Sequence, residues 1–286
     1  MASKVTKVKD YPKKPILNYR TVIKNSGDPG YVNRVLVATP VTGLVRIEWV
    51  QARYGQIIPV NWSQVMMNQF MDSYMPLQYE VADAQNIIVK EAIERDFVWL
   101  ILVEQDNVLP PNAFLMFNEY MREAKVPIVS GLYYTRSIPS EPLIFRGRGL
   151  SYYTDWKLGD VVHCDGVPTG VLLIHVGVLK EMWKDSPEYM AKNVLTRRIF
   201  DSPRALWYDP ETGYQNSKQG TSDLEWCARV IEGDYLRKAG WGDFVDSLPD
   251  KRYQMLLDTR LFVGHIDQSG AVYPPGYQPY QSSKER

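Results

Sequence analysis

The chain has little cysteine, little histidine and no excess charge of either sign. It has 286 residues with two cysteines and three histidines, so a disulfide framework is excluded and a reducing compartment is expected. Lysine plus arginine equals aspartate plus glutamate, at 33 each, which removes the electrostatic argument for specific nucleic-acid binding. No run reaches the roughly 20 apolar residues that span a bilayer, and the basic N-terminus lacks the apolar core of a signal peptide. We therefore expect a soluble cytoplasmic protein.

Composition along the chain predicts an arm, one domain and a tail. Residues 1–33 are rich in lysine and predict a flexible basic arm. A solvated arm is the simplest interpretation, and a weak peripheral contact with an anionic membrane surface is the alternative. Residues 34–267 predict a single domain, in which 185–221 lack periodicity and predict a functional loop or lid. The tail at 268–286 is rich in proline and tyrosine and is expected to be extended.

Short apolar runs alternate with helical spacings in the first half of this domain. The expected strands are 35–39, 98–103, 127–131, 167–175 and 261–267, with a further one inside 57–67. The expected helices are 44–53, 83–95, 112–125, 176–184 and 222–239. This order predicts an α/β fold with a mixed, mostly parallel sheet flanked by helices. The second half is less regular, and 132–165 predict loops or a hairpin.

The most informative segment follows the expected strand at 98–103, where Glu104-Gln105-Asp106-Asn107 precedes a double proline. Acidic groups at the carboxyl end of a buried parallel strand lie where open α/β sheets bind ligands. Carboxylates one residue apart favour a cation between them, and Mg²⁺ is usually held by one or two carboxylates plus substrate phosphates. We predict that Asp106 binds a metal, with Glu104 helping directly or through water, in an enzyme that uses a nucleotide-activated substrate. A polar turn is the simpler interpretation.

Other element ends add polar groups to the same edge of the predicted sheet. Thr39, Pro40 and Thr42 follow the first strand, and their backbone and hydroxyl groups could hold a base and a ribose. The helix that leads into the acidic strand opens with Asp83-Ala84-Gln85-Asn86, where Asp83 is also explained as an N-cap.

Two later motifs offer a base and a further metal ligand. Ser222 and Glu225 have the spacing of a capping box, which explains Glu225 without a function but leaves Asp223 unexplained. A carboxylate at a helix N-terminus is stabilised as an anion and, beside an acceptor hydroxyl, could act as a general base. His265 could complete a metal site with a neutral imidazole, although a lone histidine near a strand end is more often structural. His163 is left out, because its neighbours on a strand point to the opposite face.

Taken in order, these motifs resemble the GT-A class of nucleotide-sugar glycosyltransferases, in particular its family 2-like members. The matched elements are Val35–Thr39 with Pro40, Asp83–Asn86, the acid-x-acid signature Glu104–Asp106, Gly131–Tyr134, Gly166–Ile174, Ser222-Asp223 and His265. The resemblance implies a GT-A-like domain with a nucleotide-binding half at 34–131 and an acceptor half at 132–267.

The same resemblance implies metal-dependent transfer of a sugar from a UDP- or GDP-sugar to a hydroxyl of a glycan, a lipid-linked molecule or another acceptor. Mn²⁺ or Mg²⁺ on the diphosphate would be held by Asp106, Glu104 and His265. Asp223 would be the base of an inverting reaction, with Glu225 as the alternative base. The donor would contact Thr39, Pro40, Thr42, Gln85, Asn86, Glu104, Gln105, Asp106 and Gly170.

Two other functions remain open from the sequence. A non-catalytic protein that binds a glycan or a nucleotide sugar would keep the sheet without turnover. A nucleotidyltransferase would need a glycine-rich basic loop after the first strand, whereas 39–44 hold one glycine and no lysine.

Overall fold

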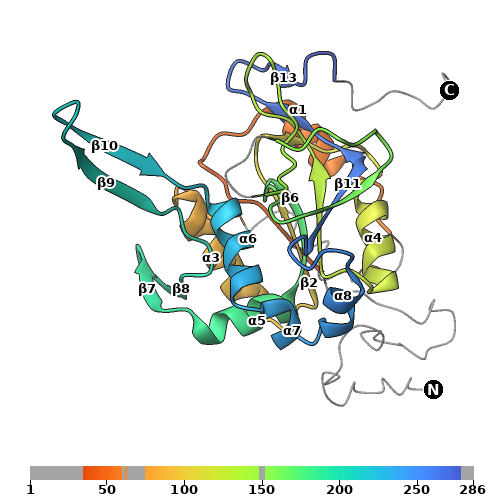
Figure 1. The fold of residues 1–286 in the computed structure, drawn as a ribbon. Coiled ribbons are helices and arrows are strands. Elements are labelled where there is room, and N and C mark those ends of the chain that lie inside the picture. The colour runs from red at the N-terminus through yellow and green to blue at the C-terminus, as the bar shows by residue number, and fades with distance from the viewer. Residues whose placement is uncertain (1–34, 60–61, 63–74, 148–151, 278–286) are drawn as a thin grey trace, which may run out of the picture.

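The computed structural model describes residues 35–59, 62, 75–147 and 152–277 (Figure 1). The predicted arm at 1–33 and the part of the predicted tail after 277 lie outside these residues, as does most of the strand expected inside 57–67. In the described part of the chain, no helix combines the length and the apolar character needed to cross a bilayer.

Six strands form the central sheet, in the order β1 (Val35–Ala38), β2 (Trp99–Val103), β6 (Val171–His175), β4 (Ile128–Leu132), β11 (Met255–Phe262) and β5 (Val161–Cys164). β1 pairs in parallel with β2, and β4 with β11. β6 and β5 run antiparallel to the strands beside them. Four strands therefore share one direction, and the predicted α/β fold with a mixed, mostly parallel sheet is confirmed.

Helices cover both faces of the sheet. α4 (Ala113–Glu123) lies on one side, and α3 (Val81–Glu94), α5 (Val176–Asp185) and α6 (Ser222–Glu232) lie on the other (Figure 1). Their inner faces are apolar and buried, as the helical spacing predicted. α1 (Ile47–Tyr54) packs beside the edge where β2 ends.

The single helix predicted over 222–239 is wrong. α6 ends at Glu232, and the short helices α7 (Tyr235–Lys238) and α8 (Gly242–Ser247) follow it. The break falls at Asp234, whose φ of 52° lies in the left-handed region and cannot continue a right-handed helix.

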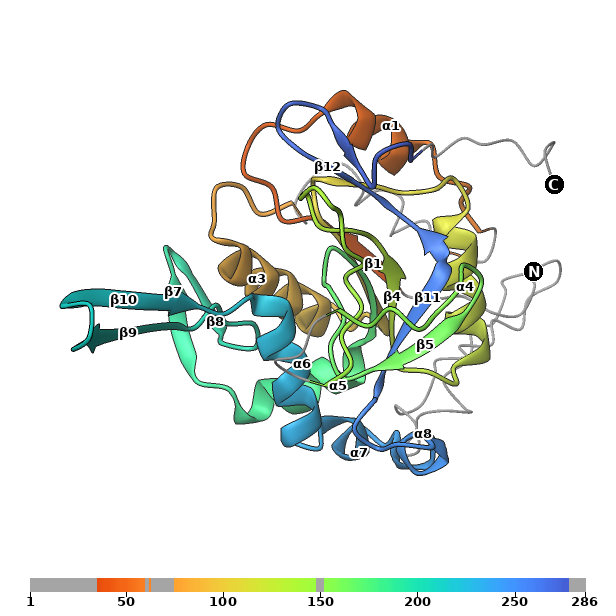
Figure 2. The ribbon, with the colours of Figure 1, turned by 45° about the horizontal axis from the view of Figure 1, so that its top comes forward.

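The unpatterned segment at 185–221 is not an irregular loop. It contains two antiparallel hairpins, one of β7 (Glu188–Ala191) and β8 (Val194–Arg197), the other of β9 (Arg204–Asp209) and β10 (Tyr214–Gln219). The second hairpin projects away from the sheet (Figures 1 and 2). Leu206, Trp207 and Tyr208 are all exposed although consecutive residues alternate between its faces. Because both faces of this hairpin meet solvent, its strands lack the alternation of apolar and polar residues by which a half-buried strand is normally predicted.

A second, three-stranded sheet positions the candidate site. It consists of β3 (Asn107–Val108), β12 (Gly264–Ile266) and β13 (Val272–Tyr273), in the order β13-β12-β3. The strand predicted over 261–267 is therefore two strands, because the chain leaves the central sheet after β11 and enters the small sheet as β12. β13 also gives part of the predicted extended tail a paired strand.

His175 is buried at the end of β6, where it caps α5. Its Nδ1 accepts a hydrogen bond of 3.2 Å from the Gly177 backbone N–H, and its ring meets Trp99 and Trp241 edge to face. Burial lowers the pKa of His175 from 6.5 to about 3, so the folded protein keeps this imidazole neutral.

We expect His175 to make the fold sensitive to acid. Below pH 6.5 His175 becomes protonated in the unfolded chain, whereas in the folded chain it stays neutral down to about pH 3. The free energy of unfolding therefore falls as the pH drops through this window, by about 3 kcal/mol between pH 6.5 and pH 4. His175→Asn keeps a capping acceptor without the titration. Denaturant unfolding should show a shallower pH slope for this variant, and equal slopes would contradict the assignment.

Candidate functional site

Polar side chains from four distant segments meet at the edge where β2 and β4 end, and we call this group the acidic edge: Glu104, Asp106, Arg136, Asp223 and His265. The β3–β12 pairing places His265 opposite Asn107, and the Ile266 N–H donates to the Asp106 carbonyl at 2.8 Å. The Nε2 of His265 consequently lies 3.4 Å from Oδ2 of Asp106. Two of the three predicted metal ligands are therefore side by side.

The imidazole of His265 is held in one orientation. Its Nδ1 donates to the carbonyl oxygen of Tyr134 at 2.7 Å, which directs Nε2 to Asp106. Metal-binding histidines are commonly fixed in this way, with one ring N–H on a backbone carbonyl and the other nitrogen on the metal. The side chain is nearly buried, and the Tyr133 ring packs against it edge to face.

Arg136 is a member of the acidic edge that the sequence analysis missed. Its guanidinium lies 3.0 Å from Oδ2 of Asp106, the same oxygen that faces His265. Burial would raise the pKa of Asp106, but the hydrogen bond and charge of His265 and the charge of Arg136 lower it below its ordinary value. The signal was available, because Arg136 follows a predicted buried strand that ends at the same sheet edge.

Glu104 and Asp223 complete the negative side of the acidic edge. Burial, Asp106 and Asp223 raise the pKa of Glu104 above its ordinary value, and the same carboxylates add to the effect of burial on the pKa of Tyr133. Asp223, in the first turn of α6, therefore acts electrostatically on Glu104. We therefore count Asp223 as the α6 carboxylate of the acidic edge.

The capping interpretations of these helix starts are wrong. The N-cap of α6 is Thr221, without a side-chain cap, and Ser222 is the first helical residue. The N-cap of α3 is Glu80, and Oδ1 of Asp83 instead accepts a hydrogen bond from the Tyr189 hydroxyl at 2.7 Å.

The predicted donor contacts Thr42 and Gln105 bind each other. The Thr42 N–H donates to Oε1 of Gln105 at 2.8 Å, and Nε2 of Gln105 donates to the Thr42 hydroxyl at 2.7 Å. The indole N–H of Trp49, in α1, donates to the Glu104 carbonyl at 2.9 Å. These bonds fix the loop after β1, which contains Pro40, to the acidic turn after β2.

Gln85 reaches the acidic edge, whereas Asn86 does not. Nε2 of Gln85 donates to the Thr169 hydroxyl at 3.1 Å, and that hydroxyl lies 3.5 Å from Oε1 of Glu104. The amide of Asn86 is used elsewhere, since its oxygen accepts from the N–H groups of residues 199 and 200 and its nitrogen donates to the Phe200 carbonyl. Asn86 therefore anchors the segment before β9, and we assign it no ligand contact.

Gly170 lies where no side chain fits. Its N–H donates to the Tyr133 hydroxyl at 2.9 Å, and a Cβ at this position would lie 2.4 Å from that oxygen and 2.5 Å from Nδ2 of Asn107. Both neighbours border the acidic edge. The predicted close approach at Gly170 is thus made by protein side chains.

We expect Gly170→Ala to destabilise the fold by about 1–3 kcal/mol, because a methyl group inserted into this contact displaces Tyr133 or Asn107. Chemical denaturation measures the loss. Gly242→Ala is the matched control, since a Cβ there meets only a side-chain nitrogen of Arg237 at 3.7 Å and alanine favours the helix. If Gly170→Ala leaves the free energy of unfolding unchanged, the packing of Tyr133 and Asn107 against Gly170 is not as tight as we describe.

The side chains of the acidic edge provide some, but not all, of the ligands that a divalent cation needs. No group of three or more His, Cys, Asp and Glu side chains arranged to hold a metal occurs among the described residues. Asp106 and His265 provide an adjacent carboxylate and imidazole, while Glu104 contacts Thr169. Thr39 Oγ1, Gln85 Oε1 and Asn107 Oδ1 are buried and have no hydrogen-bond partner within the described residues. Asn107 follows Asp106 directly and Gln85 is linked through Thr169 to Glu104, so two of these oxygens border the acidic edge.

The comparisons with known proteins identify no family. No protein-family model matches the chain, and no curated protein does. Among solved structures, the chain is similar to the crystal structure of A197 from STIV, with 12% sequence identity and a TM-score of 0.45, over 88% of this chain and 100% of that one. We draw no functional conclusion from this likeness.

Proposed function

We propose that this chain is a metal-dependent glycosyltransferase with a GT-A-like fold, which moves a sugar from a nucleoside-diphosphate donor to a hydroxyl acceptor. The observation that carries the proposal is the pair of Asp106 and His265. Two segments far apart in sequence bring these donors within 3.4 Å, and the Tyr134 carbonyl orients the imidazole toward the carboxylate.

The residues of the acidic edge then have distinct roles. Asp106 and His265 would hold Mn²⁺ or Mg²⁺ together with the donor diphosphate, and the bound ion would neutralise charge on the leaving diphosphate. Asp223 would accept the proton of the attacking hydroxyl, which gives an inverting reaction. Thr39 and Gln85 would offer the donor their buried oxygens, which lack a partner among the residues that the structure describes.

Thermal unfolding of the full chain with metals and donors tests the proposal. We expect Mn²⁺ together with one class of UDP- or GDP-sugar to raise the melting temperature by several degrees, because a ligand at about 100 times its Kd adds about 2.7 kcal/mol. Transfer to water or to an added sugar should follow with the same donor. A flat melting temperature across all metal and donor pairs would overturn the proposal.

A second candidate is a non-catalytic protein that binds a nucleotide sugar. The observation in its favour is the ion pair between Arg136 and Asp106, which places a positive charge against the carboxylate that would otherwise hold a metal. A guanidinium binds phosphate through a fixed fork of donors without any metal. Arg136 could then hold the diphosphate by itself.

Arg136→Ala separates the two candidates. If Asp106 holds a metal, we expect this variant to keep or improve its affinity for Mn²⁺, because a competing cation has been removed from the carboxylate. If Arg136 holds the diphosphate, nucleotide binding without metal should fall about tenfold or more. Calorimetric titration with Mn²⁺ and with UDP or GDP, each alone, distinguishes these results.

A further inference from the structure

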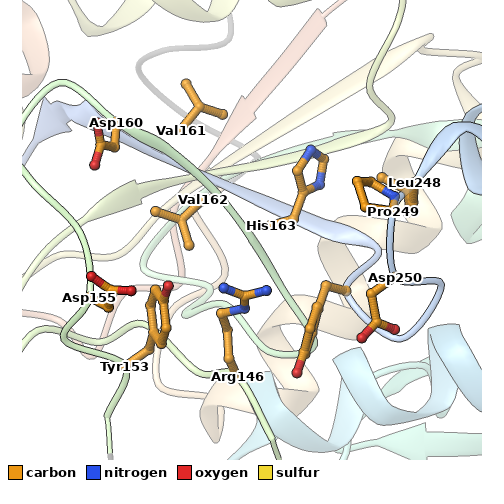
Figure 3. A pocket seen from close by; sticks show the side chains of 11 residues that line it. Arg146, Tyr153, Asp155, Asp160, Val161, Val162, His163, Leu248, Pro249 and Asp250 are labelled. Atoms are coloured by element: carbon orange, nitrogen blue, oxygen red, sulfur yellow. The ribbon is translucent and has the colours of Figure 1, made fainter.

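A cavity lies apart from the acidic edge. It has a volume of about 350 Å³ and lies between β5 and the segment at 248–253 that leads into β11 (Figure 3). Val162 and His163 of β5 line one side, and Leu248 and Pro249 line another. None of the residues of the acidic edge lines it. This volume is within the usual range of a small-molecule site. Most of the lining is polar or charged, and its apolar part consists of Val161, Val162, Leu248 and Pro249.

Arg146 is fixed inside this cavity by two aromatic rings. Its guanidinium lies 4.7 Å from the ring centre of Tyr153 and 4.2 Å from that of Tyr253. Rings over the faces of the guanidinium leave the N–H groups in its plane as the available donors. Nε of Arg146 is buried and has no hydrogen-bond partner within the described residues. The cavity therefore contains a guanidinium whose position is set by two rings.

Acceptors lie around the same space. His163 lines the cavity as a neutral imidazole, because burial and the charge of Arg146 lower its pKa. Asp155 and Asp160 are exposed at the rim. Asp250 is already neutralised by Arg252, whose guanidinium donates to it at 2.7 Å.

The balance of charge selects among ligands. An anion would meet Arg146 but also two rim carboxylates, and a cation would meet those carboxylates but also Arg146. A neutral molecule with several hydroxyl groups can accept from the guanidinium and donate to the rim carboxylates, while its apolar face packs on Val162 and Leu248. We propose that this cavity binds a neutral sugar residue, as a site separate from the acidic edge. The proposal is independent of the transferase proposal.

Ligand-observed NMR with the full chain tests this site. The probes are the methyl glycosides of glucose, galactose, mannose and N-acetylglucosamine, with phosphate and acetate as anions. We expect one of the glycosides to bind and the anions to bind more weakly. Asp155→Asn and Arg146→Lys should each weaken that glycoside about tenfold or more, because lysine keeps the charge but loses the planar fork of donors. Asp155 is exposed, so its variant is expected to fold.

Two controls keep the result specific to the cavity. Asp243→Asn removes an exposed carboxylate of α8 that does not line the cavity and should leave glycoside binding unchanged. Asp106→Asn should also leave it unchanged, whatever it does to nucleotide binding. Binding by none of the four glycosides, tighter binding of an anion, or a glycoside affinity that Asp155→Asn and Arg146→Lys leave intact would each overturn the proposal.

Discussion

Replacing Asp106 by asparagine is expected to weaken metal-dependent nucleotide binding by at least about 100-fold. Oδ2 of Asp106 is the oxygen that faces both Nε2 of His265 and the guanidinium of Arg136. An amide removes the negative charge that a divalent ion requires there, and it leaves Arg136 without its ion pair. Mutations of groups that only support metal ligands already cost about 10- to 100-fold, so the loss of a direct ligand should cost more.

Isothermal titration of Mn²⁺ and of the nucleotide in the presence of Mn²⁺ measures this loss. Asp243→Asn is the matched control, because it removes an exposed carboxylate in α8 with the same change of charge. Wild-type affinity in Asp106→Asn would remove the metal role of this residue. A similar loss in both variants would point to a general electrostatic effect instead.

Replacing Asp223 by asparagine is expected to lower the transfer rate by about 100- to 10,000-fold and to leave donor affinity nearly unchanged. That range is the usual contribution of a general base. The amide keeps the shape of the side chain and can still accept the hydrogen bond from the Leu224 N–H that Oδ1 accepts at 2.9 Å. The variant thus removes the proposed proton acceptor with little change in the first turn of α6.

Glu225→Gln is the control for the alternative base. It lies on the same helix, two residues further along, and we expect near wild-type turnover from it. Steady-state rates at saturating donor, together with donor titration, separate chemistry from binding. Full activity in Asp223→Asn with a large loss in Glu225→Gln would exchange the two assignments.

Several elements were predictable because their signals are local. The apolar run of β2 and the polar residues after it fix both a buried strand and the position of Glu104 and Asp106 at its end. The helical spacing of α3, α4 and α5 was equally readable, because each buries one apolar face. Other elements had no local signal. β11 carries Asp258 and Thr259 in its middle. Their polar atoms are paired in the folded protein by Tyr120 and the Asp160 carbonyl, which are distant in sequence, and by Arg260 on the same strand.

Some features of the acidic edge were also predictable from the sequence, and others were not. The sequence by itself determined that carboxylates follow β2 and that His265 lies near a late strand end, since a buried run and its polar boundary are properties of neighbouring residues. Only the tertiary structure decided that Nε2 of His265 faces Asp106, that Arg136 shares this carboxylate, and that Asn86 turns to residues 199 and 200 instead. These contacts depend on the β3–β12 register and on which loops cross the edge. The strand register and the path of the loops are both set by residues far apart in the chain, so the spacing of residues in the sequence does not reveal these contacts.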